Sequence, residues 1–152
     1  MKNKNFTATL AVDQTPKEAF TAILNVRGWW SENIAGSTDR LGVEFTYSYQ
    51  EVHRCRMKLI EVIPDKKVVW HVLDNDFDFT QDKDEWKDTK VIFELSRKGH
   101  KTEIRFTHQG LVPEYECFHV CSNAWASYIH GSLRSLITTG TGRPNQREKQ
   151  NC

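Results

Sequence analysis

The strongest constraint on this chain's fold is a change of hydrophobic period, from two along most of its length to about 3.6 in its last third. Alternating apolar and polar residues are typical of β-strands that cover a core with one face. The alternating stretches span residues 6–12, 43–50, 54–59, 68–73, 91–96 and 102–108. Short turns at Pro64-Asp65-Lys66 and Lys98-Gly99-His100 predict antiparallel neighbours. The sequence therefore predicts a six-stranded antiparallel sheet.

The last third predicts one amphipathic helix over residues 114–139, roughly 39 Å long. Pro113 precedes it and Gly140 follows it, as is typical of helix boundaries. Its apolar face recurs at three and four residues: Phe118, Cys121, Trp125, Tyr128, Ser132, Leu133, Leu136 and Ile137.

Two short helices are expected between the first and second predicted strands. Thr15, Pro16 and Glu18 form a capping-box start for the first of them, which should end near Arg27-Gly28. We expect the second over residues 30–34, stopped by Gly36. The result is an α+β fold in which a curved sheet wraps the long C-terminal helix. We expect a single domain over residues 1–142 and a disordered polar tail over residues 143–152.

Composition excludes several classes of function. Lys and Arg exceed Asp and Glu by only one residue, which argues against broad nucleic-acid binding. No apolar run approaches 18 residues, so we expect no membrane span. The N-terminus lacks the apolar stretch of a signal peptide, so the expected location is cytoplasmic and the expected state of the cysteines is reduced.

Aromatic side chains gather on the predicted inner side of the sheet and on the facing helix. A curved sheet around a helix leaves interior space, and aromatic rings commonly line such ligand pockets. Trp29 and Trp30 could guard its mouth. The predicted ligand-binding residues are Tyr47, Tyr49, Met57, Trp70, Phe93, Phe106, His108, Trp125 and Tyr128.

His108 is the best-placed histidine for chemistry, because it continues the inward face of Ile104 and Phe106. It would supply a polar anchor to a bound ligand. If the protein is an enzyme, it would be the general acid or base. The plainer alternative is a hydrogen-bonded core histidine.

The acidic segment 74–85 matches a calcium-binding loop only in part. Its acids fall at loop positions one, three, five, nine and twelve, but Phe79 occupies position six, where such a loop needs glycine. Cys117, His119 and Cys121 cannot share one helical face, as a zinc site would require. We therefore expect a plain acidic connection, no metal and no cofactor.

Several local patterns, in this order, resemble the START-like superfamily with its helix-grip fold. Closer still is the family named for the activator of the heat-shock-protein-ninety ATPase. The resemblance covers about residues 5–142, and the segments that carry it are Gly28-Trp29-Trp30-Ser31, residues 59–70, residues 102–111, and Trp125 and Tyr128 with residues 133–140.

The resemblance implies an internal cavity for apolar small molecules, but no single reaction. Members include lipid carriers, polyketide cyclases and chaperone cofactors, and the last of these imply a part in the stress response. We therefore expect binding of a lipid or aromatic molecule between the sheet and the C-terminal helix. The alternatives are a cyclase- or dehydratase-like enzyme using the same cavity, and an interaction module that binds a chaperone through its outer surface.

Overall fold

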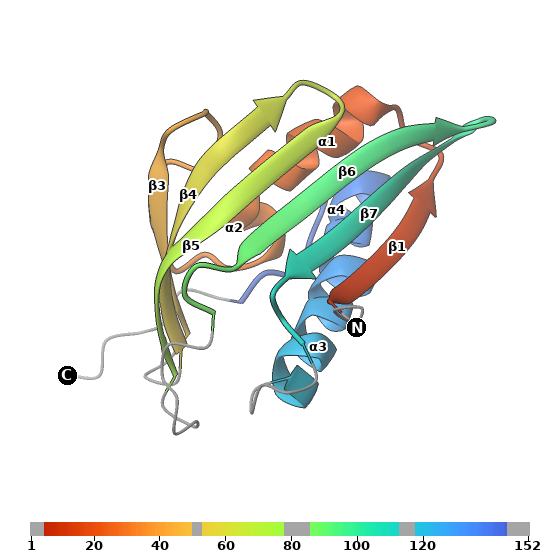
Figure 1. The fold of residues 1–152 in the computed structure, drawn as a ribbon. Helices are drawn as coiled ribbons and strands as arrows, with labels where there is room; N and C mark the ends of the chain where they lie inside the picture. Colours follow the sequence, from red (N-terminus) through yellow and green to blue (C-terminus); the bar gives the residue numbers. More distant parts are fainter. Residues whose placement is uncertain (1–4, 50–52, 78–85, 113–117, 146–152) are drawn as a thin grey trace.

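The computed structural model describes residues 5–49, 53–77, 86–112 and 118–145 (Figure 1). One antiparallel sheet curves around the helices, which all lie on its concave face (Figure 1). Its strands lie in the order β1-β7-β6-β5-β4-β3-β2. Their bounds are β1 Phe6–Val12, β2 Ile34–Gly36, β3 Glu44–Tyr49, β4 His53–Ile63, β5 Lys67–Phe77, β6 Lys90–Lys98 and β7 Lys101–Gln109.

Over the described residues the sheet has seven strands, one more than the expected six. The extra strand is β2, which pairs Ile34 with Tyr47 of β3 at the sheet edge. Three residues are too few to show a period-two pattern, so this strand was not expected. The helix predicted over residues 30–34 was wrong, because residue 34 begins β2. Gly36 is required here because its φ is +104° and an added Cβ would lie 2.4 Å from the carbonyl oxygen of Glu44.

The six predicted strands are all present, and several are longer than expected. β4 and β5 each run for eleven residues. Their pairing shifts register between Arg56 and Met57 and again between Leu59 and Glu61. Such bulges bend a strand and increase its twist, and they lie where the sheet must curve around the helices.

The capping box at the first helix is confirmed. The Thr15 hydroxyl accepts from the Glu18 amide at 3.2 Å, and the Glu18 carboxylate accepts from the Thr15 amide at 3.0 Å. Helix α1 spans Pro16–Leu24 and therefore ends before the expected Arg27-Gly28. A second helix, α2, spans Val26–Trp29, four residues earlier than predicted.

The C-terminal helix is continuous from residue 118 to residue 139, within the predicted 114–139; residues 114–117 lie outside the described residues. It consists of α3 (Phe118–Ala126), a π-helical stretch η1 (Ser127–Leu133) and α4 (Arg134–Thr139). Its most buried apolar residues recur at every fourth position: Cys121, Trp125, Ile129, Leu133 and Ile137.

The π-helical stretch explains how a four-residue repeat keeps facing the sheet. In an α-helix of 3.6 residues per turn, four residues overshoot one full turn by about 40°. Four such steps would carry the last residue about 160° away from the first. Turns closed by i→i+5 hydrogen bonds are wider and advance less per residue, which offsets this drift. The π-helical stretch therefore keeps the four-residue apolar repeat on the side of the helix that faces the sheet.

The chain then turns back across the first helices. Gly140 ends α4 with φ +86°, and residues 140–145, here called the C-terminal segment, run along α2. Asn145 donates its amide to the carbonyl of Trp30 at 3.0 Å, and its own carbonyl accepts from Glu32 at 2.8 Å. Ser132 of η1 bonds both the Trp29 carbonyl and the Arg143 amide, at 2.6 and 2.7 Å. Residues 146–152 of the predicted tail lie outside the described residues.

Candidate functional site

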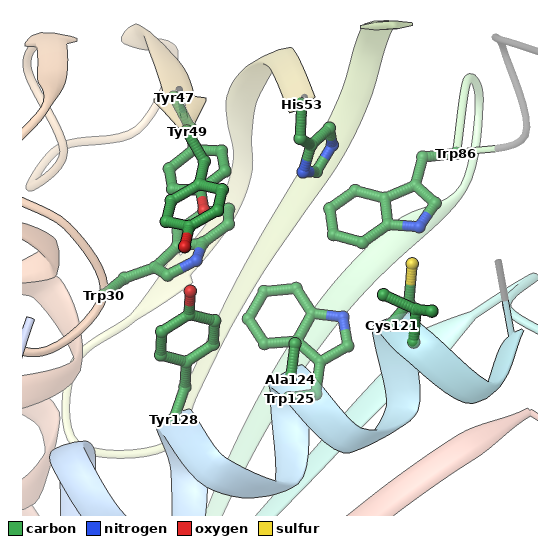
Figure 2. Close-up of a pocket in the computed structure, with 10 residues that line it drawn as sticks. Trp30, Tyr47, Tyr49, His53, Trp86, Cys121, Ala124, Trp125 and Tyr128 are labelled. Carbon is green, nitrogen blue, oxygen red and sulfur yellow. The ribbon is translucent and has the colours of Figure 1, made fainter. Parts of the chain in front are cut away.

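A pocket of about 230 Å³ lies between one end of β3 and β4 and the first half of the C-terminal helix (Figure 2). For scale, an engineered apolar cavity of about 150 Å³ holds benzene. The pocket is lined by Trp30, Tyr47, Tyr49, His53, Trp86, Val120, Cys121, Ala124, Trp125 and Tyr128. Lys, Arg, Asp and Glu are absent from this described lining.

Aromatic rings that support one another form the pocket wall. Trp30 stacks on Tyr47 with ring centroids 4.0 Å apart and packs against Trp125 at 5.1 Å. Trp86 stacks on Trp125 at 5.6 Å. Trp30, Trp86 and Trp125 are each no more than 3% exposed, so their packing fixes them. A rigid apolar wall needs little reordering when a ligand binds.

His53 lies opposite the helix, near Trp86 (Figure 2). Its Nε2 lies 2.7 Å from the Asn75 Oδ1, and because that oxygen can only accept, Nε2 carries the proton. Burial lowers the pKa of His53 to about 4, and the bond to Asn75 opposes this shift. His53 is therefore neutral at physiological pH.

His108 is fully buried behind the pocket wall and is absent from the pocket lining. The Trp125 indole donates to its Nδ1 at 3.0 Å, so Nδ1 must accept. Its Nε2 then carries the proton and donates to the Thr89 hydroxyl at 2.8 Å, which in turn donates to the Trp86 carbonyl. Burial, and to a smaller extent the neighbouring His53, lower the pKa of His108 to about 3.

Both ring nitrogens of His108 are therefore engaged, and its tautomer is fixed. This geometry fits the plainer alternative of a hydrogen-bonded core histidine that holds Trp125 and the Trp86 backbone in place. A general acid or base would instead need a ring nitrogen within reach of the substrate.

The structure divides the nine predicted ligand-binding residues into two groups. Four of them line the pocket: Tyr47, Tyr49, Trp125 and Tyr128. The other five lie outside the lining and are fully buried: Met57, Trp70, Phe93, Phe106 and His108. They fill the deeper concave side of the sheet, where Trp70 stacks on Trp29 and Trp30 and contacts Phe93 edge to face.

Sequence reasoning placed Trp30 at the pocket mouth but missed Trp86 and His53 as lining residues. Trp86 follows the acidic segment and belongs to no periodic stretch, so no local pattern singled it out. His53 had a usable signal in the sequence, because it continues the period-two alternation of Cys55 and Met57 on the inward face. The small residues Ala124 and Cys121 line the pocket because they leave space on the helix face.

Within the described residues, no group of three or more His, Cys, Asp or Glu side chains is placed to hold a metal ion. Of the acidic segment 74–85, which we expect to be a plain connection, residues 78–85 lie outside the described residues. No helix in the described part of the chain is both long and apolar enough to cross a bilayer.

A curved antiparallel sheet that grips a C-terminal helix, with a pocket between them, defines a helix-grip protein of the START-like class. The family model described as "Activator of Hsp90 ATPase homolog 1-like protein" matches residues 18–138. The chain belongs to this family, as its resemblance predicted. A comparison with curated protein sequences found no match.

Solved structures share the fold at low sequence identity. The Aha1 dimer from Colwellia psychrerythraea is 21% identical with a TM-score of 0.72, over 91% of this chain and 98% of that one. DynU16, from the dynemicin biosynthetic locus, is 13% identical with a TM-score of 0.68, over 96% of this chain and 52% of that one. CalU16 from Micromonospora echinospora is 14% identical with a TM-score of 0.61, over 88% of this chain and 74% of that one.

Proposed function

We propose that this protein binds an apolar aromatic small molecule in the pocket between β3, β4 and the C-terminal helix. The observation that carries the proposal is the pocket itself, a space of about 230 Å³ bounded by rigid aromatic rings and free of charged side chains in its described lining. Burial of a flat apolar ligand there removes apolar surface from water at about 25 cal/mol per Å². The family fold is compatible with this function.

Filling the pocket is the direct test. Ala124 is half-buried and lines the pocket, so Ala124→Leu places three more carbons in the space a ligand would take. We expect 2-ethylnaphthalene to bind the parent protein with micromolar affinity and the variant at least tenfold more weakly. The matched control is Asn123→Leu, an exposed position on the same helix, which should leave binding unchanged.

Tryptophan indole signals report where the probe lies. The chain has five tryptophans, and Trp30, Trp86 and Trp125 line the pocket while Trp29 and Trp70 do not. In ¹H–¹⁵N spectra the first three indole N–H signals should shift most on titration. If 2-ethylnaphthalene does not bind, or if Ala124→Leu binds it as well as the parent, the pocket is not the binding site.

A chaperone-directed interaction is the second candidate, because the matching family is named for an activator of the Hsp90 ATPase. Such an interaction would use outer surface. Binding of purified Hsp90 by the parent and by Ala124→Leu distinguishes the two functions. Equal Hsp90 binding by both proteins, together with no probe binding by either, would favour the interaction module.

An enzyme using the same pocket is the third reading, and the geometry favours it least. His108 is engaged at both nitrogens, and the Asn75 carbonyl oxygen fixes the tautomer of His53. An enzyme would release a chemically changed probe, which mass spectrometry of the recovered ligand would detect.

A further inference from the structure

One end of the pocket is polar, and the C-terminal segment completes it. The hydroxyls of Tyr47, Tyr49 and Tyr128 gather beside Trp30, on the opposite side from Trp86 (Figure 2). The Asn145 side-chain amide donates to the Tyr128 hydroxyl at 2.7 Å and to the Tyr47 hydroxyl at 3.4 Å. A residue 17 positions after Tyr128 and 98 after Tyr47 thus ties the two phenols together.

The Tyr47 phenol keeps its proton. Burial raises the pKa of Tyr47 well above its usual value, and a hydrogen bond with Tyr128 adds to this effect. The Asn145 side-chain NH2 group can only donate, so both phenol oxygens accept from it and each hydroxyl proton is left to be donated elsewhere. Of the two phenols, Tyr128 is the nearer to the Asn145 amide.

The number of donors and acceptors at the polar end decides which hydrogen bond the Tyr128 hydroxyl can offer to a ligand. A hydroxyl oxygen has two lone pairs and one proton. Because the Tyr128 oxygen already accepts from Asn145, its hydroxyl proton is the group left for a ligand, and Tyr128 lines the pocket. If the two phenols also bond to each other, one of their two protons is still left over. The polar end of the pocket therefore offers a donor.

The charge of the lining sets a second condition. No Lys, Arg, Asp or Glu belongs to the described lining, and His53 is neutral. An ionised ligand would lose its hydration without meeting an opposite charge among these described residues, which is strongly unfavourable. The flat rings around the remaining walls favour an aromatic body.

We propose that the pocket selects an uncharged aromatic molecule bearing a carbonyl-type acceptor, which receives a hydrogen bond from Tyr128. In this arrangement Asn145 is a positioning residue, because its amide turns the Tyr128 proton toward the ligand. This proposal rests on the proposed binding function and adds the chemical class of the ligand and the role of the C-terminal segment.

Three probes of similar shape test the ligand class: 2-ethylnaphthalene, 2-acetylnaphthalene and 2-naphthoate, titrated at pH 7.5 by calorimetry and NMR. We expect the ketone to bind about 3- to 10-fold more tightly than the hydrocarbon, the range of one added hydrogen bond. The carboxylate should bind more weakly than both. If 2-naphthoate binds tightest, the proposed ligand class is wrong although the pocket binds.

Variants test the roles of Tyr128 and Asn145. Tyr128→Phe should abolish the preference for ketone over hydrocarbon while the hydrocarbon still binds. Asn145→Asp should also abolish it, because a carboxylate accepts the Tyr128 proton, whereas the backbone bonds of residue 145 to Trp30 and Glu32 remain. Asn123→Asp makes the same change as Asn145→Asp at an exposed position outside the described lining, so it is the matched control and should keep the preference.

The outcomes separate the two proposals. Equal binding of ketone and hydrocarbon by the parent, or an unchanged preference in Asn145→Asp, would overturn the inference but leave the binding function standing. Failure of all three probes would overturn both.

Discussion

Replacement of Leu133 by Asp should abolish the cooperative unfolding transition. Leu133 is fully buried at the end of η1, in the helix that packs on α2 and β1. An aspartate there must either lose its hydration without a partner or stay protonated, and either alternative costs several kcal/mol. Native domains are stable by only about 5–15 kcal/mol, so one such change can remove most of the stability.

Urea unfolding followed by circular dichroism measures this effect. Ser127→Asp is the matched control, since it adds the same charge to the same helix at an exposed position. It should unfold within about 0.5 kcal/mol of the parent. A Leu133→Asp protein as stable as this control would show that the helix does not pack as described.

Mild acid should destabilise the parent protein steeply. His53 and His108 have folded-state pKa values of about 4 and about 3, whereas a histidine in the unfolded chain titrates near 6.5. Between these values the unfolded state binds more protons, so the free energy of unfolding rises with pH. The contribution is complete above about pH 6.5 and is lost as the pH falls toward 4 and 3.

As the pH falls from 7 to 5, proton uptake by each histidine in the unfolded state should lower the free energy of unfolding by about 2 kcal/mol. The two histidines together should lower it by about 4 kcal/mol. Urea midpoints measured at pH 5, 6 and 7 give the slope. His53→Gln should remove about half of it, whereas His119→Gln, at an exposed position, should leave it unchanged. A flat profile for the parent would mean that neither histidine stays neutral in the folded state, and NMR titration of the two rings would check this directly.

Local patterns were enough to predict most of the elements. Alternation over residues 102–108 identifies β7 because a strand exposes one face and buries the other, whatever it pairs with. The capping box of Thr15 and Glu18 lies within three residues and needs no distant partner. The long helix was visible for the same reason, since its apolar face repeats within the segment itself.

Other features depend on partners far away in the chain. β2 exists because β3 lies beside it, and three residues alone have no period. The π-helical stretch follows from matching a four-residue repeat to the sheet. Asn145 reaches Tyr47 and Tyr128 only because Gly140 turns the chain back and Gly142 passes close to Gly28. An added Cβ at Gly142 would lie 2.0 Å from the Gly28 carbonyl oxygen.

The pocket is the feature that local sequence patterns could not predict and that depends on the tertiary structure. The sequence alone was enough to infer the family, the helix-grip architecture and the inward side of the six predicted strands. It could not distinguish Tyr47, which borders a space, from Trp70, which is packed on all sides. Periodicity reports only that a side chain faces the core. Whether it meets another atom or an empty volume depends on the sizes of neighbours such as Trp30, Trp86 and Ala124, which the chain brings together only when it folds.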